Sequence, residues 1–157
     1  ELSRKTGFNA ELYVITREGP VFMGVRSGES EFRISMEVGH LVRSVVYHPA
    51  GAFYLHAYPE NIRRVCAESG HDVCNIDYQR RRIARAAQGL FAADRGGFRQ
   101  ELTRVGITGP DFRYCFCLSG LSGDFTDMTD ESLGQVMHEE YKNFIKTFAP
   151  SDQTGCW

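Results

Sequence analysis

An α+β fold is predicted for this chain of 157 residues by a change in the period of its apolar residues. Residues 9–77 alternate apolar and polar side chains in short runs, whereas from Tyr78 onward apolar residues recur at helical spacing. We therefore expect an antiparallel β meander of about five to seven strands over 1–77 and a mainly helical half with one strand over 78–157. The two parts suit one compact unit, because a chain of this length can bury a sizeable core.

The expected strands of the first half are short and are separated by turn residues. They cover residues 12–17, 21–25, 32–36, 42–47 and 52–58. Glu18-Gly19-Pro20 breaks the first strand, and His48-Pro49-Ala50-Gly51 joins the last two, because glycine and proline favour backbone angles found in turns. Residues 61–66 follow Pro59 and fit either a sixth strand or a short helix, since a short apolar run does not distinguish the two.

The second half predicts a different set of elements. They are a helix over 80–93, a short helix over 98–105, a buried strand over 112–118 and a loop over 119–127. Gly96-Gly97 separates the two helices, and Gly106 ends the second one. The loop is predicted by its glycine, serine and aspartate residues.

A long C-terminal helix is expected to begin after Thr129, whose hydroxyl group can cap free backbone N–H groups. Asp130 and Glu131 suit the positive end of its dipole, and Pro150 ends it. Its apolar residues form one stripe, made up of Leu133, Val136, Met137, Tyr141, Phe144, Ile145 and Phe148. We expect this stripe to pack on the rest of the domain.

One segment has a pattern typical of a known family. Gly39-His40 precedes the alternating run 42–47, and an aromatic-His-Pro-x-Gly turn at 47–51 follows. On these residues, 10–77 resembles roughly two blades of a WD-repeat β-propeller. The resemblance implies a set of small twisted sheets that stack on one another.

The sequence departs from the propeller pattern at two points. Val65-Cys66 stands where the Trp-Asp pair would lie, so the hydrogen-bond network that holds His40 in such a blade has no partner there. Two blades also do not close a ring, which typically takes about four to eight. The resemblance therefore implies a fragment, or a sheet that a partner completes.

Composition narrows the classes of function. The formal net charge of −2 gives no overall attraction to nucleic acid or anionic lipid. No apolar run approaches the roughly 18 residues of a membrane span, and the N-terminal residues lack a signal-peptide core. The cysteine count of five is odd, and Cys115 and Cys117 share one face of a strand, which is a poor arrangement for a disulfide. We therefore expect free thiols and an intracellular protein, cytoplasmic or nuclear. No membrane partner is expected.

No complete catalytic, metal or cofactor signature occurs. His138-Glu139-Glu140 has no second histidine four residues away, and the cysteines lack the paired spacing of zinc sites. The glycine-rich segment 119–123 lacks a phosphate-binding pattern. Cys115 or Cys117 could pair with His71 or His138 as a nucleophile and base, but any chain with five cysteines and five histidines offers such pairs. We therefore predict no catalytic residue, no metal and no cofactor.

Arginines are concentrated between residues 80 and 104. Guanidinium groups bind phosphate oxygens well, so this segment is the candidate nucleic-acid-binding site. Its residues are Arg80, Arg81, Arg82, Arg85 and Arg99. The alternative interpretation is a solvated helix face, or arginines that pair with acidic groups of the chain or of a partner.

These observations favour a non-enzymatic binding or scaffold protein with a protein partner, in a larger intracellular assembly. An RNA-associated protein that uses the arginine-rich segment 80–104 is the first alternative. A small enzyme of unknown reaction is the second.

Overall fold

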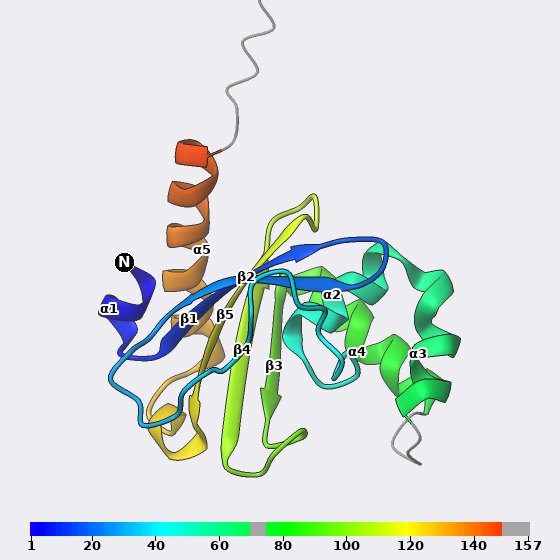
Figure 1. Ribbon diagram of the computed structural model, residues 1–157, viewed down its shortest axis with the longest axis horizontal. Coiled ribbons are helices and arrows are strands. Elements are labelled where there is room, and N and C mark those ends of the chain that lie inside the picture. The colour runs from blue at the N-terminus through cyan, green and yellow to red at the C-terminus, as the bar shows by residue number, and fades with distance from the viewer. Residues whose placement is uncertain (70–74, 149–157) are drawn as a thin grey trace, which may run out of the picture.

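The computed structural model describes residues 1–69 and 75–148 and has an α+β fold, which confirms the predicted fold class. Five strands form one antiparallel sheet in the order β2-β1-β5-β4-β3 (Figure 1). The strands are β1 (Asn9–Ile15), β2 (Pro20–Arg26), β3 (Phe91–Arg95), β4 (Leu102–Thr108) and β5 (Tyr114–Leu121). The helices are α1 (Leu2–Thr6), α2 (Pro49–Ala57), α3 (Ile62–Ser69), α4 (Ile76–Gly89) and α5 (Asp130–Phe148), with 3₁₀ turns at Pro59–Asn61 and Ser122–Phe125.

Each face of the sheet packs against its own helices. On one face, side chains such as Tyr13 and Cys117 join α2, α3 and α4 in one core cluster. On the other face, Val105 and Leu118 pack against α1 and α5 in a second cluster. Alternate residues of β1, β3 and β5 contribute to the two clusters, as the pleat of a sheet requires. Figure 1 shows α5 on the opposite side of the sheet from α2 and α4.

The two edges of the sheet differ. Along the edge strand β2, the Phe22 N–H group donates to the His40 carbonyl at 2.9 Å, and the Val42 N–H group donates to the Pro20 carbonyl at 2.9 Å. Residues 39–42 therefore cover that edge. β3 is the other edge strand and pairs with β4 alone among the described strands.

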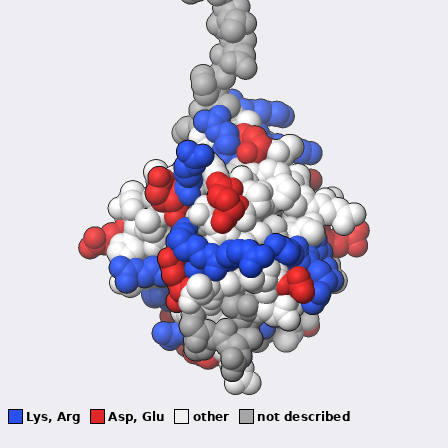
Figure 2. All heavy atoms as spheres, turned by 90° about the vertical axis from the view of Figure 1, so that its right-hand side faces the viewer, with Lys and Arg blue, Asp and Glu red and all other residues white. Residues whose placement is uncertain are grey.

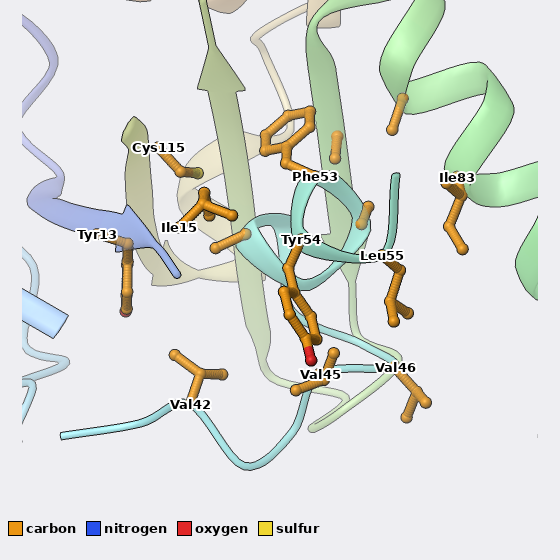
Figure 3. Packing of buried hydrophobic residues seen from close by; sticks show 14 of the residues in the cluster. Tyr13, Ile15, Val42, Val45, Val46, Phe53, Tyr54, Leu55, Ile83 and Cys115 are labelled. Carbon is orange, nitrogen blue, oxygen red and sulfur yellow. The ribbon is translucent and has the colours of Figure 1, made fainter. Parts of the chain in front are cut away.

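The predicted strand 52–58 is wrong, because residues 52–57 belong to helix α2. Pro49 occupies the first turn of α2, and the His48 side chain caps it by accepting a hydrogen bond from the Ala50 N–H group at 3.1 Å. Phe53, Tyr54 and Leu55 are buried although they are consecutive. Figure 3 shows these three side chains leaving the helix in different directions. A helix that is buried all round has no amphipathic period to detect.

Other elements also differ from the predicted ones. Residues 32–36 and 42–47 form no regular strand, and 61–66 lie mostly in helix α3. The helix predicted over 80–93 is α4, which ends earlier because Leu90 takes a left-handed conformation with φ of 50°. The helix predicted over 98–105 is also wrong, since most of it lies in the β3–β4 turn and in strand β4.

Several predictions are confirmed. β1 and β2 match the first two alternating runs, and β5 matches the buried strand predicted over 112–118. The Thr129 hydroxyl caps α5 by accepting a hydrogen bond from the Ser132 N–H group at 3.1 Å. Leu133, Met137 and Tyr141 of the apolar stripe are buried, and the Val136, Phe144 and Ile145 side chains are partly exposed. The Phe148 side chain lies outside the described residues.

The resemblance to a WD-repeat propeller is wrong. The sheet is a single open sheet, and residues expected in two of the strands of the second blade are helical instead, in α2 and α3. Gly39-His40 belongs to the segment that covers β2. Among the described residues, no helix is long and apolar enough to cross a bilayer.

Candidate ligand-binding site

A row of polar side chains crosses the α2 face of the sheet. Asp94 of β3 lies opposite Arg104 of β4, and Arg104 lies opposite Ser119 of β5. The Ser119 hydroxyl donates a hydrogen bond to Glu11 of β1, which completes the row. All four residues are buried. Buried polar groups destabilise a fold unless they are paired or bind a ligand, so this row is the candidate ligand-binding site.

Glu11 is the most deeply buried acid of the row. The Tyr13 hydroxyl donates to its Oε2 atom, and the Ser119 hydroxyl donates to its Oε1 atom. Burial raises the pKa of the Glu11 carboxyl group, while these hydrogen bonds and the charge of Arg104 act in the opposite direction. Burial also raises the pKa of Tyr13, so the phenol keeps its proton.

His48 continues this hydrogen-bond chain from the opposite side. Its Nδ1 atom accepts from the Ala50 N–H group, so the proton of the neutral ring is on Nε2. Nε2 lies 3.1 Å from the Tyr13 hydroxyl oxygen and donates to it. Burial lowers the pKa of His48 well below its usual range, and the charges of Arg104 and Arg82 add to this effect. The chain therefore runs from His48 through Tyr13 to Glu11.

Arg104 is the only buried cation of the row. It donates from Nη2 to the Asp94 carboxylate at 2.9 Å, and its guanidinium carbon lies 5.1 Å from the centroid of the Phe98 ring. The Nε–H group is buried, and no hydrogen-bond partner for it exists in the part of the chain that the structure describes. An unpaired buried donor costs roughly 1–3 kcal/mol. An acceptor on a bound molecule would remove that cost.

A cavity of about 620 Å³ lies above the polar row. Its polar floor includes Glu11, Tyr13, His48, Arg104 and Ser119. Its apolar walls come mainly from the segment before α2 and from the β3–β4 turn, and include Phe32, Ile34, Met36, Leu41, Val42, Val46, Tyr47 and Phe98. Figure 3 shows Val42 and Val46 on that segment, with Tyr13 pointing toward Val42 from β1. Apolar walls and a few convergent polar groups at this volume are typical of small-molecule sites.

The arginines predicted to bind nucleic acid lie elsewhere. Arg80, Arg81 and Arg85 are exposed on α4, and Arg99 is exposed beside Phe98. Figure 2 shows basic side chains in a band across the right-hand side of the molecule in Figure 1, where α3 and α4 lie. Arg82 turns inward and donates to the His48 carbonyl at 2.8 Å. None of the five lines the cavity above the polar row.

The cysteine–histidine pairing is also not assembled. Cys115 and Cys117 are buried free thiols whose Sγ atoms lie 3.6 Å apart on the α2 face. His138 lies on α5, which packs on the other face of the sheet. His71 lies outside the described residues. Burial raises the pKa of Cys117, which disfavours a thiolate nucleophile.

Sequence reasoning missed the residues of the polar row. One signal was present in β1, where Glu11 shares a face with Tyr13 and Ile15 although that face is otherwise apolar. A charged residue at an inward position of an alternating strand is unusual. Arg104 was grouped with the exposed arginines because its segment was predicted to be helical.

Comparisons with known proteins give a consistent fold. No family model matches the chain, and no curated protein matches it. The transcriptional regulator YaiJ superposes with a TM-score of 0.78 at 11% identity, over 93% of this chain and 88% of that one. An IclR-family putative regulator from Rhodococcus sp. gives 0.79 at 19%, over 93% and 59%. An IclR homologue from Microbacterium hydrocarbonoxydans, complexed with 4-hydroxybenzoate, gives 0.70 at 15%, over 88% and 59%.

The fold of this chain is therefore that of a domain found in IclR-type transcriptional regulators, and the chain spans about three-fifths of the Rhodococcus and Microbacterium proteins. These likenesses overturn the expectation of a scaffold protein and of an RNA-associated protein, since the similar structures are those of transcriptional regulators and of an IclR homologue.

Proposed function

We propose that this chain is the effector-binding domain of an intracellular transcriptional regulator, and that the cavity above the polar row binds a small organic anion. The observation that carries the proposal is Arg104, a buried cation with an unpartnered Nε–H group that lines the cavity. The similarity of fold to regulators supports it.

The geometry suggests how such a molecule would lie. A carboxylate accepts well from a guanidinium group, so the anionic end belongs at Arg104. The apolar body would pack against walls such as Phe32 and Val42. Glu11 and Tyr13 then offer hydrogen-bonding groups to a hydroxyl or second polar group on the same molecule. 4-Hydroxybenzoate, which the Microbacterium protein holds, combines these features and is the first probe.

Isothermal titration calorimetry with 4-hydroxybenzoate, benzoate and short aliphatic carboxylates tests the proposal. We expect at least one carboxylate to bind, and Arg104→Gln to weaken it by about tenfold or more, because a buried charged hydrogen bond is lost. Arg99→Gln is the matched control, since Arg99 lies over the same Phe98 ring but is exposed.

Removing Arg104 alone leaves Asp94 buried without its partner, which can unfold the domain. The double variant Asp94→Asn/Arg104→Gln removes both charges and keeps the shape of the pair. If this folded double variant binds the carboxylate as tightly as the parent chain, or if no carboxylate binds the parent, the proposal is wrong.

A further inference from the structure

The edge strand β3 has backbone groups that nothing in the described chain pairs. The Gly96 N–H group donates to the Leu102 carbonyl at 2.9 Å, and the Thr108 N–H group donates to the Leu90 carbonyl at 3.1 Å. In an antiparallel pair, residues that bond to the neighbour alternate with residues whose N–H and C=O groups point away. By this alternation, Phe91, Ala93 and Arg95 present theirs to the open edge.

The opposite edge strand, β2, is protected from pairing with another chain. Residues 39–42 bond to β2 and cover it, as described above. Proteins usually cover, twist or charge an exposed edge, because a free edge pairs with other chains. β3 has no such cover among the described residues. The exposed side chain of Ala93, at the middle of the strand, is small and does not shield its backbone groups.

A groove of about 1050 Å³ runs beside this edge. The whole of β3 forms one wall, and α4 forms the other with Tyr78, Arg81, Arg85 and Gly89. An extended chain laid along β3 would therefore have its alternate side chains directed toward α4.

The charge of the groove is positive. Asp94 and Asp130 line it, but they are paired with Arg104 and Arg95. Arg81 and Arg85 are four residues apart and thus on one side of α4, and neither has an acidic partner among the described residues. Two exposed cations beside an open strand edge favour an acidic occupant.

We propose that β3 and α4 form a docking groove for an extended acidic segment of a protein partner, which adds to the sheet as a sixth strand. Main-chain hydrogen bonds to Phe91, Ala93 and Arg95 would supply the pairing, and acidic side chains at alternate positions would meet Arg81 and Arg85. A second copy of this chain fits less well, because pairing two β3 edges would bring two basic α4 helices onto the same face.

The test uses two fluorescein-labelled eight-residue peptides in which Val alternates with Glu or with Lys. Fluorescence anisotropy should show that the Glu peptide binds at least about tenfold more tightly than the Lys peptide. Arg81→Gln/Arg85→Gln should remove this preference. Arg63→Gln/Arg80→Gln is the matched control, because these arginines are exposed on α3 and α4 but do not line the groove.

Hydrogen exchange measured by NMR distinguishes strand addition from loose electrostatic attraction. The bound Glu peptide should slow exchange at the amides of Phe91, Ala93 and Arg95. Ala93→Pro removes the central N–H group that points to the open edge, without breaking a bond to β4. It should therefore lower the affinity for the Glu peptide by about tenfold or more, whereas Ala93→Val should leave that affinity unchanged.

Three results would overturn the proposal. The first is equal affinity for the two peptides, which includes binding of neither. The second is binding of the Glu peptide without protection of these amides. The third is self-association in sedimentation that Ala93→Pro abolishes, which would make a second copy the occupant.

Discussion

Tyr13 donates its hydroxyl hydrogen to Glu11, two positions earlier on the same strand, so both side chains lie on the α2 face. His48 donates to the same hydroxyl oxygen from the start of α2. One phenol group thereby connects a buried acid of the sheet to the cap of the helix that packs on it. The stability of the domain should therefore depend on pH through Glu11 at one end of this hydrogen-bond chain and through His48 at the other.

The first prediction concerns Glu11. Burial raises its folded-state pKa above the unfolded value, so its contribution to stability is fully present below the unfolded pKa and is lost as pH rises through the folded pKa. Glu11→Gln does not titrate. The free energy of unfolding of the parent, measured with urea at rising pH, should fall relative to that of the variant. A constant difference between the two proteins would show that Glu11 has an ordinary pKa.

The second prediction concerns His48, for which stability changes with pH in the opposite direction. Its folded-state pKa is lowered, so the parent should lose stability as pH falls below about 6.5, where the unfolded histidine takes up a proton and the folded one does not. His48→Asn keeps a helix-capping acceptor but does not titrate. Thermal unfolding between about pH 5 and pH 8 should show a flatter curve for the variant. A parallel acid-side loss in both would contradict this assignment.

The third prediction concerns Gly51. The sequence predicts a turn at Gly51, but this residue lies within α2, and a Cβ atom there would lie 2.0 Å from the Val45 carbonyl oxygen. Gly51→Ala should destabilise the domain by on the order of 3 kcal/mol, because the clash is with backbone. In the control Gly123→Ala, the added Cβ atom meets nothing within 4 Å, so its effect should stay within about 0.5 kcal/mol. Equal denaturation midpoints for the two variants would refute the close approach.

The fourth prediction concerns α5. Met137 is fully buried against the second cluster, whereas Phe144 is half-buried and contacts the Phe116 ring at a centroid distance of 5.1 Å. Met137→Ala should cost about 2–5 kcal/mol. Phe144→Ala should cost less than the roughly 3–5 kcal/mol of a fully buried phenylalanine. Urea denaturation checks both values. A silent Met137→Ala would mean that α5 does not pack on the sheet.

Local patterns in the sequence were sufficient for several elements. β1 has alternately buried and half-buried residues, so its side chains follow the pleat. β5 is buried over most of its length, so it appears in the sequence as one apolar run. α5 has one buried face and a Thr129 cap, and these signals lie within the helix itself. The placement of Cys115 and Cys117 on one face follows from the same alternation.

The elements that were misassigned depend on contacts between distant segments. α2 is buried on every side, which erases its helical period. β4 contains Gly106, a poor strand former, because a Cβ atom there would lie 2.6 Å from the Pro49 side chain of α2. The close packing of α2 on β4 thus accounts for the glycine in the strand, and the apolar pattern of either element alone does not predict its structure.

The sequence by itself determined an α+β domain with two N-terminal strands, one later strand and a capped C-terminal helix, because periodicity and capping are local properties. Only the tertiary structure decided the site. Glu11 and Arg104 lie far apart in the sequence, and the strand order β2-β1-β5-β4-β3 aligns them through Ser119 on one face. That order is selected by the packing of whole helices on the two faces, a property of the folded chain that no single segment encodes.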